Sequence, residues 1–314
     1  MADPLPQDPS PLLELRNVSK RYGRPPDLAE RIGRLLGAPQ RPAAPPAVDR
    51  VSLAVAPGEV LGLVGESGSG KSTLGRIAAS LHAPSSGSRW WKGRDMDAMD
   101  AQQRRQTRLA IQMIFQDPYA SLNPRMQVQH IIGEAPLAHG LVDARRQRDY
   151  VAGLMRQVGL DPALMQRFPH QFSGGQRARI GIARALAVKP EFLVCDEAVA
   201  ALDVSIQAQV LNLFMRLREE LRLTSIFISH DLTVVRHVAD RVAIMLRGRI
   251  VELGPTEAVY GNPRHPYTRA LLAAAPKMEV GKITYVPALE PARFDQADNV
   301  LREVEPGHYC AGLP

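Results

Sequence analysis

The sequence contains few cysteines, few aromatic residues and no long hydrophobic run. Only Cys195 and Cys310 occur in 314 residues, so the chain builds neither a disulfide framework nor a closed zinc site. No stretch approaches the roughly 18 apolar residues that a membrane-spanning helix needs. The first residues also lack the basic and apolar regions of a secretory signal. We therefore expect the chain to stay in the cytoplasm.

Charge is close to balanced, with a modest basic excess. Lys and Arg number 39 against 32 Asp and Glu, and the net charge of +7 weakly favours an anionic partner. Arg145, Arg146 and Arg148 alternate with Asp143 and Asp149, a pattern typical of a solvated helix face. Because no aromatic residues interleave with these charges, we expect no nucleic acid partner.

Apolar runs bounded by turn residues predict a series of short strands. The expected strands are 12–18, 51–55, 60–64, 109–115, 192–195, 225–229, 242–246 and 250–253. Between the first two, the proline-rich stretch 24–47 predicts an insertion loop with a short helix at 27–36. From 127 to 187 the pattern is helical, with no convincing strand.

The order of these elements predicts the fold class. A helix expected at 205–221 carries an apolar stripe and separates strands 192–195 and 225–229. Short apolar strands separated by a helix are typical of a parallel sheet that is buried on both faces. The sequence therefore predicts an α/β core with a parallel sheet, interrupted by a helical subdomain at about 117–187.

A glycine-rich loop follows strand 60–64 and opens a helix at Lys71. It matches the phosphate-binding P-loop pattern through Gly65, Glu66, Ser67, Gly68, Ser69, Gly70, Lys71, Ser72 and Thr73. Backbone N–H groups of such a loop ring a phosphate, the lysine adds a positive charge, and the Ser72 hydroxyl is suited to Mg²⁺. The motif alone leaves kinases, GTPases and many ATPases open.

Two further motifs narrow the choice among these classes of nucleotide-binding protein. Ser173, Gly174, Gly175 and Gln176 open a helix, with Ser173 as its cap and two glycines that let backbone amides approach an anion. Strand 192–195 then runs into Asp196 and Glu197, at the edge where α/β sheets bind ligands. Asp196 is suited to hold Mg²⁺, and Glu197 to take a proton from an attacking water.

Together these motifs resemble the ABC-type ATPases over roughly residues 12–275. Residues 173–176 match the family's signature sequence, with Phe172 where Leu is commoner. The resemblance implies a P-loop NTPase core with a parallel sheet, a small antiparallel β subdomain and an inserted helical subdomain that carries the signature. It also implies that the signature of one subunit caps the γ-phosphate held by the P-loop of another.

The resemblance assigns further positions in chain order. Gln116 is similar to the Q-loop glutamine that touches Mg²⁺ and water, and Asp203 to the D-loop residue at the dimer contact. His230 resembles the switch histidine near the γ-phosphate, and Tyr22 the aromatic residue that stacks on adenine. The implied cofactors are ATP and Mg²⁺, with Glu197, His230 and Gln116 as the catalytic group.

Three segments point to one branch of the family. Residues 116–125, 203–209 and 262–268 are similar to the oligopeptide, dipeptide and nickel importers, and the insertion 24–47 resembles their second ATPase subunit. The ATPase domain is then expected at 12–262, and a C-terminal extension of the oligopeptide-transporter type at 263–314. The transported solute is not readable from this chain.

This resemblance implies partners and a location. The partners are a second ATPase subunit, identical or different, two transmembrane permeases, and an external solute-binding protein that acts through them. The chain would lie peripherally on the cytoplasmic face of the bacterial inner membrane. Soluble ABC ATPases of translation or DNA repair are the alternative class, but they usually carry two cassettes or a long coiled coil. The sequence has one P-loop, one signature and no heptad run.

Overall fold

The computed structural model describes residues 10–23, 45–274 and 300–312. The expected helix at 27–36 lies outside these ranges. The strands are β1 (Leu13–Lys20), β2 (Val48–Val55), β3 (Val60–Val64), β4 (Ser86–Trp91), β5 (Arg94–Asp95), β6 (Ile111–Ile114), β7 (Phe192–Asp196), β8 (Thr224–Ile228), β9 (Arg241–Leu246), β10 (Arg249–Pro255), β11 (Leu301–Glu305) and β12 (His308–Ala311).

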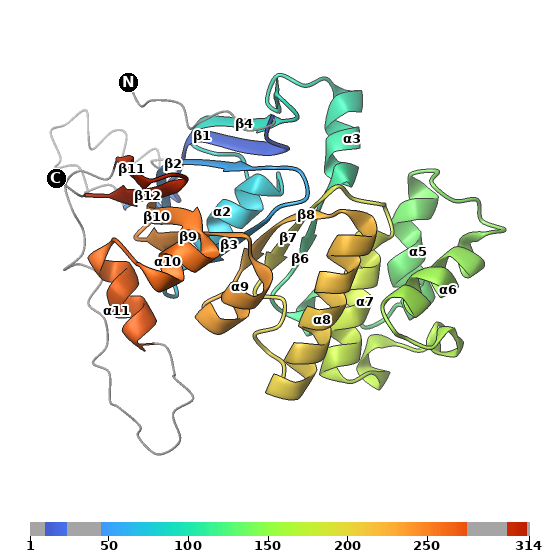
Figure 1. The fold of residues 1–314 in the computed structure, drawn as a ribbon. Helices are drawn as coiled ribbons and strands as arrows, with labels where there is room; N and C mark the ends of the chain where they lie inside the picture. The colour runs from blue at the N-terminus through green and yellow to red at the C-terminus, as the bar shows by residue number, and fades with distance from the viewer. Residues whose placement is uncertain (1–9, 24–44, 275–299, 313–314) are drawn as a thin grey trace, which may run out of the picture.

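Helices cover both faces of the larger sheet and form a lobe beside it (Figure 1). They are α2 (Lys71–Ala78), α3 (Ala101–Ala110), α4 (Pro118–Ser121), α5 (Val128–Ala138), α6 (Gln147–Gln157), α7 (Gly174–Leu186), α8 (Val204–Leu221), α9 (Leu232–Val238), α10 (Thr256–Gly261) and α11 (Pro266–Ala274). In the part of the chain that the structure describes, no helix has the length and apolar character of a membrane span.

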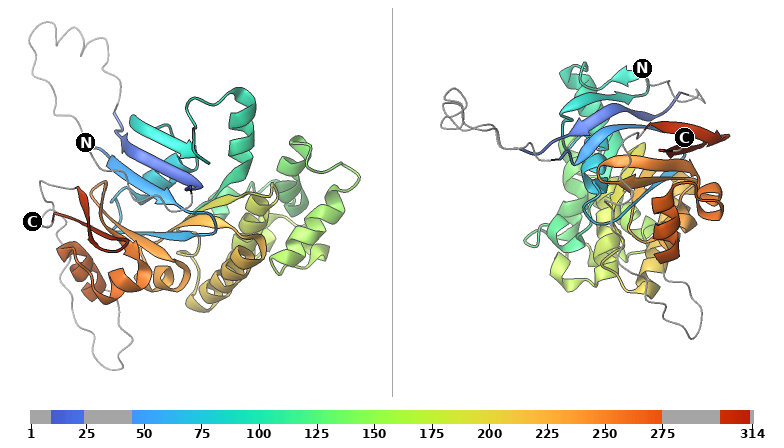
Figure 2. Two further views of the ribbon diagram at one scale, coloured as in Figure 1. Left: turned by 45° about the horizontal axis from the view of Figure 1, so that its top comes forward. Right: turned by 90° about the vertical axis from the view of Figure 1, so that its left-hand side faces the viewer.

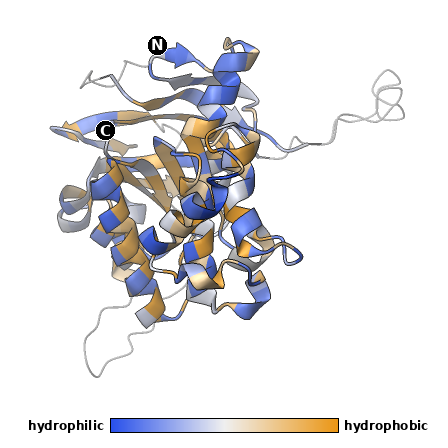
Figure 3. Ribbon diagram, turned by 90° about the vertical axis from the view of Figure 1, so that its right-hand side faces the viewer, coloured by the Kyte–Doolittle hydropathy of each residue, from blue (hydrophilic) through white to orange (hydrophobic). Residues whose placement is uncertain are grey.

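The larger sheet has the order β11-β12-β10-β9-β3-β8-β7-β6. Its centre is parallel: β3 pairs with β8 and β9, and β7 pairs with β8 and β6. Strand β3 shows why its sequence is apolar throughout. Val60 and Val64 belong to one core with α8 and α9, while Leu61 and Leu63 belong to a second core with α2. The expected α/β core with a parallel sheet is confirmed, and the strands appear as hydrophobic ribbons between helices (Figure 3).

The smaller sheet is antiparallel, with the order β2-β1-β4-β5. Leu13, Leu15 and Leu53 join the second core, so this sheet and β3 enclose α2 between them (Figure 2). The sequence did not predict β4, β5 or α3. Helix α3 has only Thr107 buried, so it lacks the apolar stripe of an ordinary surface helix. The expected strand at 109–115 is shorter, because its first two residues end α3.

The helical lobe is the expected insertion between β6 and β7. Helices α5, α6 and α7 pack together through buried Ile132, Val151, Met155 and Ile180, and residues 127–187 contain no strand. At the other end of the sheet, β12 pairs with β10 through Glu252 opposite Cys310 and Leu253 opposite Tyr309. The hairpin of β11 and β12 was not predicted from the sequence.

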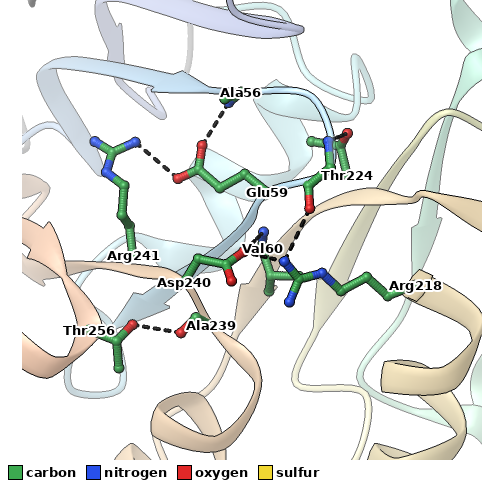
Figure 4. Close-up of polar contacts among 10 residues, drawn as sticks. Ala56, Glu59, Val60, Arg218, Thr224, Ala239, Asp240, Arg241 and Thr256 are labelled. Carbon is green, nitrogen blue, oxygen red and sulfur yellow. Dashed lines mark hydrogen bonds and ion pairs between the residues drawn. The ribbon is translucent and has the colours of Figure 1, made fainter. Parts of the chain in front are cut away.

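Polar side chains hold the edge at which the parallel strands begin (Figure 4). Val60 donates its N–H to Asp240 at 2.8 Å, and Arg218 donates to the same carboxylate oxygen at 2.5 Å. Glu59 accepts from the Ala56 N–H at 2.7 Å and from Arg241 at 2.9 Å. We call these residues the amino-terminal edge, because they lie where the parallel strands of the larger sheet begin. Each carboxylate there has an arginine partner.

Candidate functional site

The P-loop lies at the opposite edge, where β3 ends and α2 begins. Gly70 has φ +105°, a left-handed conformation that favours glycine, and a Cβ there would come within 2.1 Å of the Ala47 carbonyl oxygen. A Cβ on Gly65 would come within 2.2 Å of the Met245 carbonyl oxygen. Both glycines are therefore required by the loop's close passage past neighbouring backbone. The turn leaves Lys71 as the first residue of α2.

Lys71 is folded back into this loop. Only 5% of the residue is exposed, and its Nζ donates to the carbonyl oxygens of Gly65 and Glu66, each at 2.7 Å. Burial lowers the pKa of the Lys71 ammonium, and the nearby carboxylates of Glu197 and Asp196 oppose this shift. The loop thus holds a cation among neutral acceptors at the place where a phosphate would bind.

An oxygen pair lies beside the loop. The Ser72 hydroxyl donates to Asp196 Oδ1 at 2.8 Å, and Asp196 is only 2% exposed at the end of β7. Burial raises the pKa of Asp196, while the Ser72 hydrogen bond and the Arg76 charge lower it. A hydroxyl and a carboxylate next to a phosphate loop fit Mg²⁺, which prefers oxygen ligands and is bound by few carboxylates together with substrate phosphates.

Glu197 is the centre of a second polar cluster. Gln116 donates from Nε2 to Glu197 Oε2 at 2.7 Å, and His230 Nδ1 lies 3.5 Å from the same oxygen. These residues follow β6, β7 and β8, which are neighbours in the sheet. Glu197 has φ +47°, an unfavourable conformation for a residue with a Cβ, and its N–H donates to the Ile228 carbonyl at 3.0 Å. Strained backbone of this kind concentrates at functional sites.

The signature residues form a separate unit with the Asp203 turn. Ser173 and Gln176 make a reciprocal capping box at the start of α7. A Cβ on Gly175 would come within 2.3 Å of the Ile206 side chain, so α7 and α8 are in close contact. Ser173 and Asp203 are exposed. This unit therefore presents its polar residues to solvent, and its contacts are with α8.

Tyr22 contacts residues that belong to neither cluster. The residue is 51% exposed, and its ring packs edge-on against His82 with centroids 6.2 Å apart and has Lys20 Nζ 5.5 Å from its centroid. The structure thus brings four of the expected residues next to the P-loop and its Ser72, which are Gln116, Asp196, Glu197 and His230. Residues 173–176 lie instead beside the Asp203 turn, at the starts of α7 and α8.

One residue at the P-loop was missed by the sequence analysis. The Tyr267 hydroxyl accepts a hydrogen bond from the Glu66 N–H at 3.2 Å, although 201 positions separate them. The segment His265-Pro266-Tyr267 belongs to residues 262–268, which indicated one branch of the family but no contact with the phosphate loop. Nothing in the local sequence indicates that its tyrosine reaches the phosphate loop.

Two family models match the chain. The model for ABC transporters covers residues 48–200, and the model for the C-terminal region of oligopeptide and dipeptide transporters covers residues 251–299. The first range includes the P-loop, the signature, Asp196 and Glu197. The second includes the His265-Pro266-Tyr267 segment.

Individual proteins are similar over most of the chain. The oligopeptide transport ATP-binding protein AppF of Bacillus subtilis is 48% identical over 266 residues, which is 84% of this chain and 78% of that protein. The oligopeptide transport ATP-binding protein OppF of Salmonella typhimurium is 53% identical over 239 residues, covering 76% and 71%. A dimeric ATP-binding cassette solved with ADP and Pi superposes with TM-score 0.65 and 26% identity, covering 78% of this chain and 98% of the other.

The chain belongs to the ATP-binding subunits of ABC transporters, in the oligopeptide and dipeptide transporter group. It is an ATP-binding and ATP-hydrolysing subunit whose hydrolysis energises transport. The expected family and the expected P-loop ATPase fold are thereby confirmed.

Proposed function

We propose that this subunit energises the import of peptides or a related small solute across the cytoplasmic membrane. Two relatives at about half identity are named oligopeptide transport ATP-binding proteins, and this similarity supports the solute class. The proposed mechanism rests on one observation, that the expected site residues lie in two separate groups. Asp196 and Glu197 lie next to the P-loop and its Ser72, whereas Ser173 and Asp203 form an exposed unit at the starts of α7 and α8.

Each residue beside the P-loop has a proposed task. The loop from Gly65 to Thr73 surrounds the phosphates of ATP with backbone N–H groups at the start of α2, where the helix dipole favours an anion. Lys71 exchanges its carbonyl partners for the β- and γ-phosphate oxygens. Ser72 and Asp196 would hold Mg²⁺, with Gln116 close to it, and the ion would neutralise charge on the phosphates when bound.

Glu197 is proposed as the general base. Its Oε2 accepts from Gln116 and lies near His230, so the carboxylate is held at the end of β7 by groups on two flanking strands. A water placed between Glu197 and the γ-phosphate would lose its proton to this carboxylate and attack phosphorus in line with the leaving ADP. The products are ADP and inorganic phosphate.

The second half of each site would come from another ATPase subunit. Ser173, Gly174, Gly175 and Gln176 would contact the γ-phosphate held by the partner's P-loop, and Asp203 would lie at the dimer contact. Val204 supports this placement, because this apolar residue is 80% exposed at the start of α8, next to Asp203. Tyr22, half exposed, is the proposed platform for the adenine ring.

The remaining partners are proposed from the transporter class. Two transmembrane permeases would contact the loop after Gln116, at residues 117–125, and an external solute-binding protein would act through them. The subunit would then lie peripherally on the cytoplasmic face of the bacterial inner membrane. Its ATPase partner would be a sister subunit or a second copy of this chain.

Reconstitution tests the proposal. The chain would be placed in lipid vesicles with its permeases, its sister ATPase and the cognate solute-binding protein, and both ATP hydrolysis and solute uptake would be measured. We expect a peptide-loaded binding protein to stimulate hydrolysis and uptake together. Stimulation by a metal complex or sugar, and not by peptides, would change the solute class. Hydrolysis without coupled uptake of any solute would contradict the importer function.

A further inference from the structure

The Tyr267 side chain connects the C-terminal region to the phosphate loop. Tyr267 is completely buried at the start of α11, and its hydroxyl accepts a hydrogen bond from the Glu66 N–H at 3.2 Å. Burial raises the pKa of the Tyr267 hydroxyl to about 12, so it stays protonated near neutral pH. This contact joins two segments that are far apart in the sequence.

The same peptide unit also holds Lys71. The N–H of Glu66 and the carbonyl of Gly65 belong to one planar peptide group, and they point to opposite sides of it in the trans form. The Gly65 oxygen accepts from Lys71 Nζ at 2.7 Å. Tyr267 and Lys71 therefore form hydrogen bonds to opposite sides of the same rigid peptide group. A rotation of that unit would move the acceptor on which the Lys71 ammonium rests.

A buried carboxylate fixes the turn that carries Tyr267. Glu252 on β10 is fully buried, and its carboxylate accepts from the backbone N–H of Arg264 at 2.7 Å and of His265 at 3.0 Å. The Tyr267 N–H in turn donates to His265 Nδ1 at 3.1 Å. Burial lowers the pKa of His265, which keeps the ring neutral so that Nδ1 can accept.

The terminal hairpin is fastened to the same carboxylate. His308 Nε2 on β12 lies 2.8 Å from Glu252 Oε1, and both side chains are essentially inaccessible. A continuous chain of hydrogen bonds thus runs from the hairpin through Glu252 and the His265 turn to Tyr267. It ends on the peptide that holds Lys71.

We propose that Tyr267 is a positioning residue for nucleotide binding, which fixes the Gly65–Glu66 peptide so that Lys71 is presented to the β- and γ-phosphates. This inference rests on the proposed role of Lys71. A tyrosine that only stabilised the fold would fill the same space, but its hydroxyl would have no particular effect on phosphate recognition.

Tyr267→Phe tests the proposal, because it removes one oxygen and keeps the ring. We expect the dissociation constant for ATP to rise about three- to ten-fold, the range that one hydrogen bond in such a network supports. The loss for ADP should be smaller, since ADP lacks the γ-phosphate that Lys71 would contact. The measurement is equilibrium binding of labelled ATP and ADP to the full-length chain.

Tyr260→Phe is a matched control. The Tyr260 hydroxyl donates to the Leu232 carbonyl at 2.6 Å, so this variant also loses a tyrosine hydrogen bond to backbone, but away from the P-loop. We expect its ATP-to-ADP affinity ratio to equal that of the parent, even if its thermal midpoint falls as much as that of Tyr267→Phe.

Glu252→Gln provides a second variant that tests the relay itself. An amide keeps the shape but presents an NH₂ group to one of the three donors, so we expect a smaller change of the ATP-to-ADP ratio in the same direction. An unchanged ratio in Tyr267→Phe, or equal changes in Tyr267→Phe and Tyr260→Phe, would overturn the proposal. Lys71→Ala separates the two claims: if it keeps full ATP affinity, the role of Lys71 itself is wrong.

Discussion

The two edges of the parallel sheet differ in how their charged side chains are paired. At the amino-terminal edge, Glu59 pairs with Arg241 and Asp240 with Arg218. At the other edge, Asp196 and Glu197 are adjacent carboxylates, and the buried Lys71 is bonded to carbonyl oxygens. Burial raises the pKa of Asp196 and lowers that of Lys71, so it opposes the charged form of both.

This difference supports the proposal that the ligand binds at the P-loop edge. The amino-terminal edge satisfies its charges within the chain, so it gains nothing from a further ion. The P-loop edge holds charges that a metal cation and a polyphosphate would complement, and it keeps Glu197 in a left-handed conformation. Strained and incompletely compensated groups of this kind are retained where function needs them, at some loss of stability.

Lys71→Ala should produce the largest effect, because it removes the only lysine of the P-loop. We expect hydrolysis to fall by roughly 1000-fold or more and ATP to bind more weakly, since an electrostatic contact to the transferring phosphate alone accounts for about 10²–10³ in rate. Phosphate release and nucleotide binding would be measured. Lys92→Ala, which removes a surface lysine paired with Glu191, is the control and should leave both unchanged. Equal turnover in Lys71→Ala and parent would contradict the assignment.

Glu197→Gln should separate binding from chemistry. The amide keeps the shape but does not accept a proton from water, so we expect turnover to fall by about 10²–10⁴-fold while ATP binding persists. A closed ATPase dimer should accumulate with ATP and Mg²⁺, visible by size-exclusion chromatography. Near-parental phosphate release in the assembled transporter would place the base elsewhere, with His230 as the next candidate.

Asp240→Ala tests the opposite edge. It leaves the fully buried Val60 without its N–H acceptor, which should lower the free energy of unfolding by about 1–3 kcal/mol while the rate constant for hydrolysis stays unchanged. Denaturant unfolding and ATPase assays would be compared. Asp240→Asn keeps one acceptor oxygen and should lose less. A large loss of turnover in the folded Asp240→Ala protein would show that the two edges are coupled.

Asp196→Asn should give the smallest change in stability of these variants. Burial raises the pKa of Asp196 in the folded protein. The neutral Asp196 therefore costs the folded state nothing below the ordinary aspartate pKa, and the folded state loses stability as pH rises through the raised pKa. At pH 7 without Mg²⁺, Asp196→Asn should therefore unfold at a slightly higher temperature than the parent. With Mg²⁺ and ATP, the parent should gain more stability than the variant, because only the parent keeps both proposed Mg²⁺ ligands. This difference in unfolding temperature should disappear in acid. Equal unfolding temperatures of variant and parent at pH 7 without Mg²⁺ would contradict the raised pKa of Asp196.

The sequence predicted what depends on local pattern. Strands β3, β7 and β8 are continuous apolar runs, and this is what burial on both faces requires. Gln116, Glu197 and His230 could be expected near one another because each follows a strand of the same parallel sheet. Their roles stay predictions until the variants are measured.

The sequence could not predict contacts that depend on distant partners. Strand β4 is a short segment with mixed burial, and α3 is polar on nearly all sides, so neither has a clear period. The capping box of Asp100 and Gln103 was the one local signal for α3. The contact of Tyr267 with Glu66 and the positive φ of Glu197 arise only from tertiary packing.

The pairing of β12 with β10 has a consequence for synthesis of the chain. All of β10 except Arg249 and Pro255 is buried, and its partner residues on β12, Cys310 and Tyr309, come 58 and 56 positions after Glu252 and Leu253. While the ribosome is still adding that segment, β10 has an uncovered, apolar edge that can pair with another nascent chain. Premature termination before Leu301 should therefore favour aggregation of a cassette whose P-loop and parallel strands have already been made.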